Sequence, residues 1–217
     1  MELFGFGNSV GYYKTYIKKD GGYISLEEDT KDFCGKWLRP VHPENWDWTT
    51  RNFDKEENKP TIEEARVIGM MVYEDISKKK TQVDLSSISN SKAIMAFFDP
   101  DGKYFEMNMK EFAYALDVEL EHGKIRDANV TSNHPFLTAM VVLAHMSESL
   151  TYYRRLKVME TEAEIFEIER KLKDRVLFTQ ELKDKLEQKK SDLQTAKNEL
   201  DQRLAMMDDF PVMDTLE

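Results

Sequence analysis

The chain has 217 residues, of which 41% are hydrophobic and 11% aromatic, so it can form a packed core and is not a wholly disordered chain. Its formal net charge of −10 argues against nucleic acid as the main ligand, because neutralising a phosphate backbone needs a basic face. The single cysteine, Cys34, excludes an intrachain disulfide and a cysteine-based zinc site, and it favours a cytoplasmic location. No apolar stretch is long enough to cross a membrane, so no membrane partner is expected.

The segment from Val10 to Leu26 predicts a β-hairpin. Aromatic and β-branched residues lie on both sides of Asp20-Gly21-Gly22. These glycines can adopt the positive φ angles that a tight hairpin turn requires.

All three tryptophans, Trp37, Trp46 and Trp48, lie between residues 33 and 53, where Pro40 and Pro43 oppose a regular element. We interpret this segment as an irregular loop held by a small aromatic core. Two alternatives stay open. With Arg39, the tryptophans are also typical of a protein-binding hot spot or of a stacking platform for bases.

A helix is predicted after Pro60, because Thr61 and Glu64 have the spacing of a capping box, and it should end near Lys78. A second hairpin is predicted over residues 93–107, centred on the turn Asp99-Pro100-Asp101-Gly102. A second helix should follow, from Asn108 to Gly123.

The longest predicted element begins at Pro135, which suits the first turn of a helix. No proline or glycine occurs from Phe136 to Met206, so the sequence predicts one very long helix. Breaks near Thr151 or within residues 176–178 remain open. Residues 136–146 are apolar on nearly every face, which predicts that the start of this helix is buried.

After residue 160 the helix shows coiled-coil heptads with one apolar row and one half-polar row. Such heptads predict self-association, packing against another protein, or a helix that stays single. The predicted partner-binding residues are Ile165, Ile168, Leu172, Leu182, Leu186, Leu193 and Leu200. The acidic tail, residues 208–217, adds Phe210 as an apolar anchor for a docking peptide.

No catalytic residue, metal ligand set or cofactor site is assigned from the sequence. His145 and Glu148 lie three residues apart on one predicted helix face, but the position of a second zinc-binding histidine holds Ser149. A metal there would need ligands from elsewhere. No nucleophile–base pair or phosphate-binding loop is visible, so an enzyme is not expected.

Together these patterns predict an α+β fold. A small N-terminal domain over 1–130 would hold two β-hairpins and two helices, a long helix would follow over 131–207, and an acidic tail would end the chain. The expected function is that of a non-enzymatic structural or adaptor protein that assembles with protein through this helix, for example in a large complex such as a virion. The alternatives are a nucleic-acid-binding accessory protein that uses the Trp-rich loop, and an enzyme or metalloprotein centred on His145 and Glu148.

Overall fold

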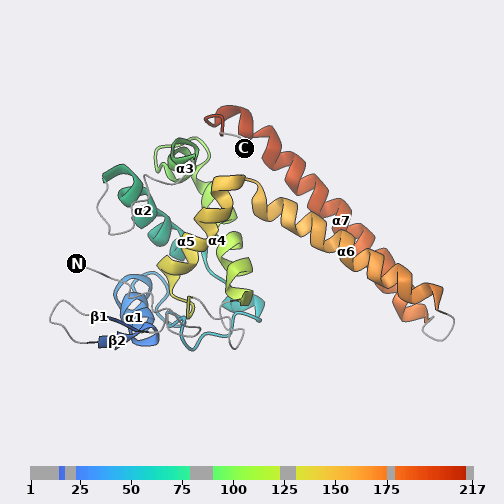
Figure 1. The fold of residues 1–217 in the computed structure, drawn as a ribbon, viewed down its shortest axis with the longest axis horizontal. Coiled ribbons are helices and arrows are strands. Elements are labelled where there is room, and N and C mark those ends of the chain that lie inside the picture. The colour runs from blue at the N-terminus through green and yellow to red at the C-terminus, as the bar shows by residue number, and fades with distance from the viewer. Residues whose placement is uncertain (1–14, 18–22, 79–89, 123–130, 175–178, 214–217) are drawn as a thin grey trace. The chain divides into compact units, whose positions relative to one another are not determined.

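The computed structural model describes residues 15–17, 23–78, 90–122, 131–174 and 179–213 (Figure 1). The chain forms two compact units, and the boundary between them falls after Glu148. We call the part before it the N-terminal unit and the part from Ser149 to Val212 the helical hairpin. Both units are built almost entirely of helices in the residues that are described, so the predicted α+β fold class was wrong.

The first elements are two short strands and a helix. Strands β1 (Thr15–Ile17) and β2 (Tyr23–Ser25) pair antiparallel within the segment that predicted the first hairpin, and the predicted turn lies outside the described residues. Helix α1 (Leu26–Phe33) follows directly and was not predicted, although Ser25 and Glu28 form a capping box at its start. It continues as a π-helix over Cys34–Leu38, inside the predicted loop.

Helix α2 (Ile62–Lys78) begins and ends where the sequence predicted. Its capping box is confirmed, because the Thr61 amide donates to Glu64 Oε2 at 2.9 Å and the Glu64 amide donates to Thr61 Oγ1 at 3.2 Å. The start of α2 is therefore fixed by its own residues.

The second predicted hairpin is wrong, because its two strands are helix α3 (Ser91–Phe98) and the first turn of helix α4 (Phe105–His122). The turn between them is present, with the Gly102 amide donating to the Asp99 carbonyl at 3.0 Å. In α3 the buried residues are Ala93, Ile94, Phe97 and Phe98, which is the spacing of a helix face. An apolar run this short has no periodicity that separates a buried strand from a buried helix.

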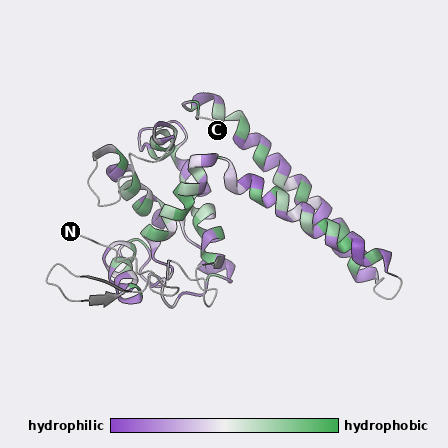
Figure 2. Ribbon diagram, in the orientation of Figure 1, coloured by the Kyte–Doolittle hydropathy of each residue, from purple (hydrophilic) through white to green (hydrophobic). Residues whose placement is uncertain are grey.

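The core of the N-terminal unit lies between α2, α3, α4 and α5 (Pro135–Glu148). The Phe98 ring meets the rings of Phe97 and Phe112 edge to face, with centroids 4.9 and 4.8 Å away. Gly69 lets α2 approach this cluster, because a Cβ at that position would lie 3.0 Å from Phe98 Cδ1. Figure 2 shows α5 as hydrophobic along most of its length, as the sequence predicted for residues 136–146.

The single long C-terminal helix was also wrong. The run after Pro135 forms three helices: α5, α6 (Tyr152–Lys173) and α7 (Gln180–Ala205), of which α7 is the longest at 26 residues. The first break, at residues 149–151, is one of the two breaks left open. There the Thr151 amide donates to Ser149 Oγ, a local side-chain bond that replaces helix backbone pairing.

The second break separates α6 from α7. Asp174 has extended backbone angles, and residues 175–178 lie outside the described part of the chain. Thr179 then caps α7 by accepting the Leu182 amide at 3.2 Å. The two helices pack side by side in opposite directions, and a short 3-10 turn over Met207–Asp209 follows α7.

Candidate functional site

The predicted heptad rows form the seam between α6 and α7. Ile168 on α6 and Ala196 on α7 are almost fully buried in this seam, at 5% and 1% exposure. The other predicted partner-binding residues of the two helices are half-buried: Ile165, Leu172, Leu182, Leu186, Leu193 and Leu200. The heptads therefore describe a contact that the chain makes with itself.

Ion pairs between the two helices flank the seam. Glu199 of α7 accepts from Arg154 at 2.6 Å and from Lys157 at 3.1 Å. Lys197 pairs with Glu162 at 2.8 Å. Lys189, one of the polar residues in the half-polar row, pairs with Glu164 of α6. The pair with Glu164 explains why that row holds Lys189. Glu199 engages Arg154 and Lys157, two basic side chains that could otherwise contact phosphate.

The face of α6 opposite the seam carries a second apolar row, and this row is exposed. Met159 and Phe166 each expose 59% of their surface, and Ala163 between them is also exposed. Their spacing of four and then three residues places all three on one side of the helix, away from Ile168. The Arg170 guanidinium lies 6.0 Å from the centre of the Phe166 ring. We call Met159, Ala163 and Phe166 the outer face of α6.

A hollow of about 300 Å³ adjoins this outer face, and Ala163 is common to both. Ala163 and Ile168 supply its apolar lining, and it is further lined by Glu164, Glu167, Lys171 and Lys185. The outer face and the hollow together form a continuous surface that an apolar side chain can enter.

The middle of α6 is strongly acidic. Between Met159 and Arg170 the sequence has five glutamates and no basic residue, and all five are exposed. Within the described residues neither Glu160 nor Glu169 forms an ion pair, whereas Glu167 pairs with Arg170 at 3.1 Å. Basic residues on the outer side occur only beyond this segment, at Arg155, Arg170 and Lys173.

The tryptophans do not form a joint platform. Trp48 is fully buried and donates its indole Nε1–H to Glu64 Oε1 at 3.0 Å. Trp46 is covered by the Arg39 guanidinium, 3.8 Å from its ring centre. Trp37 is 41% exposed, with Lys36 Nζ 4.5 Å from its ring. Each tryptophan therefore has a different neighbour, and the aromatic core predicted for this loop exists only around Trp48 and Phe53, whose ring centres are 5.3 Å apart.

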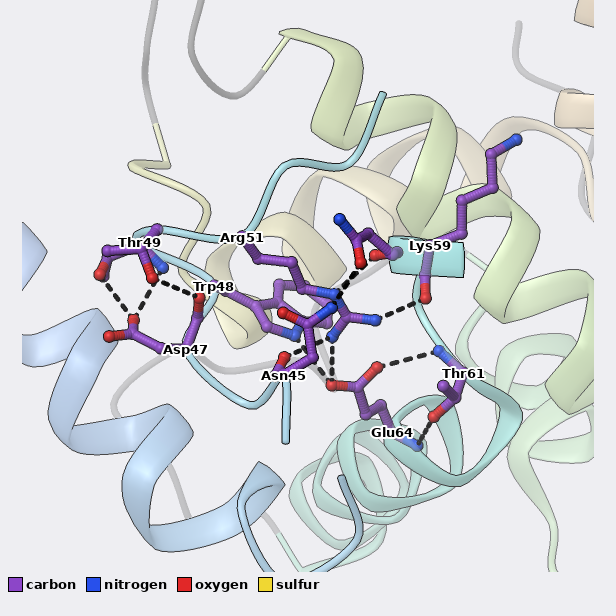
Figure 3. A network of polar contacts seen from close by, with 10 residues as sticks. Asn45, Asp47, Trp48, Thr49, Arg51, Lys59, Thr61 and Glu64 are labelled. Atoms are coloured by element: carbon purple, nitrogen blue, oxygen red, sulfur yellow. Dashed lines mark hydrogen bonds and ion pairs between the residues drawn. The ribbon is translucent and has the colours of Figure 1, made fainter. Parts of the chain in front are cut away.

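A fully buried ion pair in the N-terminal unit joins Arg51 and Glu64 (Figure 3). Both side chains have 0% exposure, and Arg51 Nη1 lies 2.7 Å from Glu64 Oε1. Arg51 also donates to the carbonyls of Asn45, Asn58 and Lys59, at 3.2, 2.6 and 2.6 Å. One guanidinium thus holds the loop from residue 45 to residue 59 against the start of α2, which is a structural role.

A second hollow, of about 660 Å³, lies beside this loop and is lined partly by Phe53, Lys59, Asp117 and Asn133. Lys59 Nζ lies 3.2 Å from Asp117 Oδ2. Burial nevertheless raises the pKa of Asp117, against the opposing effect of Lys59, and a hydrogen bond with Glu56 raises the pKa of Lys59. These two groups pair with each other, and the described residues that line the hollow include no histidine, cysteine or serine.

His145 does not lie with Glu148 in a metal site. Its Nε2 is 3.6 Å from Glu119 Oε1 of α4, and Glu148 is exposed. The described part of the chain holds no group of three or more His, Cys, Asp or Glu residues that could bind a metal ion. Phe210 is half-buried, with the Arg203 guanidinium 5.8 Å from its ring centre, so it packs within the helical hairpin.

The fold and these surfaces define a helical protein with a packed N-terminal unit and a helical hairpin that exposes an apolar face. Residues 65–162, which run from α2 to the middle of α6, are similar to a family model described as a protein of unknown function, DUF5661. No curated protein and no solved structure matches the chain. Among the described helices, none has the length and apolar character needed to span a membrane.

The outer face of α6 was missed in the sequence, although a signal for it exists there. Leu156, Met159, Ala163 and Phe166 repeat at alternating steps of three and four residues. This row is shorter than the heptad row from Ile165 to Leu200, which begins on the other side of α6 and gives the stronger periodic signal.

Proposed function

We propose that this protein is a non-enzymatic adaptor that binds another protein through the outer face of α6. The observation that carries the proposal is the exposure of Met159 and Phe166, at 59% each, on a helix whose other apolar row is already covered by α7. Large side chains of these types bind well when a partner covers them, since full burial of one contributes about 1.5–3 kcal/mol.

The remainder of the hairpin supports this choice of face. Apart from half-covered seam residues, the described residues of α7 are polar on the side away from α6, and Leu204, at 36%, is its one large apolar side chain in the exposed class. A face built on a packed helix pair is also held in place before binding, which reduces the entropy lost on association. The proposal therefore replaces the seam residues with the outer face as the partner-binding surface.

The wider setting follows from the same proposal. A helical hairpin with one exposed apolar face suits a component of a larger assembly, of which a virion is one example. The lone buried Cys34 supports a cytoplasmic location for it, because a thiol in an oxidising compartment is usually paired.

Site-specific photo-crosslinking tests the proposal. A photoreactive phenylalanine analogue replaces Phe166 on the outer face or Gln202 on the polar side of α7, in the full-length chain inside the cells that produce it. We expect position 166 to give one abundant protein–protein adduct and position 202 to give none. The adduct from position 166 should vanish when Met159→Ser is added, and it should persist with Met107→Ser, an exposed methionine of α4 (50%) that serves as the matched control. Equal adducts from both positions, or an adduct insensitive to Met159→Ser, would contradict the proposal.

A further inference from the structure

We infer that the occupant of the outer face of α6 is a basic amphipathic helix of another protein and not a second copy of this chain. This inference rests on the proposed function and adds the chemistry of the partner. It comes from the distribution of charge around Met159, Ala163 and Phe166.

The charges on this side of α6 are ordered in three blocks. Arg155 precedes the apolar residues, the five glutamates from Glu160 to Glu169 surround them, and Arg170 and Lys173 follow. Three of these glutamates have a basic partner: Glu162 pairs with Lys197, Glu164 with Lys189 and Glu167 with Arg170. The net negative charge beside the apolar residues therefore comes mainly from Glu160 and Glu169.

This order of charges disfavours pairing between two copies. The pattern of basic, acidic and basic blocks reads almost the same in both directions along the helix. Two copies of α6 that met through Met159 and Phe166 would place acidic block against acidic block, whether they ran parallel or antiparallel. Like charges facing each other across an interface oppose association, whereas a basic partner gains from the same field.

The shape of the surface selects a helix. Met159, Ala163 and Phe166 present apolar groups at the spacing of two helical turns, with a small residue in the centre and a hollow of about 300 Å³ beside it. A partner helix laid along such a face inserts its own residues at positions i, i+3 or i+4, and i+7. Its polar side then carries the lysines or arginines that reach Glu160 and Glu169.

Two synthetic 18-residue helices test the inference against the full-length protein. They share one apolar face of leucine and isoleucine, and they carry lysine or glutamate at the same polar positions. Fluorescence anisotropy at low and at physiological salt measures their affinities. We expect the lysine helix to bind at least about tenfold more tightly than the glutamate helix, and the preference should shrink as salt rises.

Charge variants separate this surface from the general attraction of a chain whose net charge is −10. We expect Glu160→Lys/Glu169→Lys to weaken the lysine helix about tenfold and to improve the glutamate helix. Glu181→Lys/Asp201→Lys changes two exposed acids of α7 by the same total charge and should leave both affinities within about twofold. Met159→Ser/Phe166→Ser should abolish binding of both helices.

The outcomes separate the inference from the proposed function. If the two helices bind equally and still require Phe166, or if neither binds, the inference of a basic partner is overturned. The proposed adaptor function is then decided by the crosslinking test alone. If the lysine helix binds the Met159→Ser/Phe166→Ser variant as tightly as the wild type, both the inference and the proposed function are overturned. A dimer in light scattering that Met159→Ser/Phe166→Ser converts to a monomer identifies a second copy as the occupant and overturns the inference.

Discussion

The N-terminal unit and the helical hairpin bury their side chains in different ways. In the N-terminal unit four helices enclose aromatic and aliphatic residues such as Phe98 and Phe112, which have no exposure. In the hairpin two helices cover only one side of each other, so Ile168 and Ala196 are buried while most of the seam leucines remain half-exposed. A pair of helices has too few layers to close a core, and this geometry leaves surface for another protein.

Charged residues show the same contrast. Arg51 and Glu64 are paired without any exposure, whereas the pairs that flank the seam are partly exposed, and Lys197 and Glu162 have side-chain exposures of 43% and 51%. Water screens an exposed pair, so each contributes about 0–1 kcal/mol. A buried charge that loses its partner is far more costly. The comparison predicts large effects of substitution in the N-terminal unit and smaller ones in the hairpin.

The largest expected effect comes from Glu64→Ala. It leaves the Arg51 guanidinium buried without its carboxylate and removes half of the capping box, so the free energy of unfolding should fall by about 3–5 kcal/mol. All three tryptophans lie in the N-terminal unit, so urea denaturation followed by tryptophan fluorescence measures this unit. Glu63→Ala, at a neighbouring glutamate whose side chain is 57% exposed, is the matched control and should change stability by less than about 0.5 kcal/mol. Similar losses for both variants would mean that the buried pair does not dominate.

The next effect belongs to the seam. Ile168→Ala should destabilise the hairpin by about 2–4 kcal/mol, because it opens a gap where α6 meets α7. Far-UV circular dichroism follows this loss, since α6 and α7 contribute many helical residues and no tryptophan, and tryptophan fluorescence provides the internal reference. Ile168→Val keeps most of the volume and should cost only about 0.5–1.5 kcal/mol. If alanine and valine behave alike, the seam is not the contact that holds the hairpin together.

A third effect concerns Cys34 and appears only at high pH. Burial raises the pKa of this thiol from 9.0 to about 12, although a hydrogen bond with the Trp48 backbone lowers it in part. The folded protein therefore favours the protonated thiol. The contribution of this thiol to the free energy of unfolding is complete below pH 9 and decreases as the pH rises from 9 toward 12. At pH 10 the loss amounts to about 1.4 kcal/mol.

The measurement compares the wild type with Cys34→Ala between pH 8 and pH 10. Lysines and tyrosines titrate in both proteins, so the difference between their unfolding free energies isolates the thiol. We expect the unfolding free energy of the wild type to fall by about 1.4 kcal/mol relative to that of Cys34→Ala between pH 8 and pH 10. A difference that stays constant would show that Cys34 is accessible to water in the folded protein.

The parts of the fold that the sequence predicted are those fixed by neighbouring residues. Thr61 and Glu64 cap α2 wherever the chain goes next, and Pro135 marks the first turn of α5 in the same way. The heptad residues lie in the seam between α6 and α7, but a heptad states only that a helix must cover them. Whether that helix belongs to the same chain depends on the break between α6 and α7, which no proline or glycine indicates.

The second hairpin failed for a related reason. Asp99-Pro100-Asp101-Gly102 does form a turn, yet a turn motif does not specify the elements that it joins. The role of Arg51 has no sequence signal, because its ion pair with Glu64 joins residues 13 apart, one of them in an irregular segment. The outer face of α6 had a periodic signal, but its exposure depends on how α7 packs, and that is a tertiary property.

The smallest expected effect on stability is the one that bears most on function. Met159→Ser/Phe166→Ser replaces two side chains that already expose 59% of their surface, so the free energy of unfolding should change by no more than about 0.5 kcal/mol by either probe. The crosslinked partner and the binding of the lysine helix should nevertheless be lost. If the double variant unfolds as readily as Ile168→Ala, Met159 and Phe166 pack within the folded chain in solution, and the loss of binding would then report damage to the hairpin. Unchanged stability with lost binding would instead show that these two side chains are kept exposed for a partner.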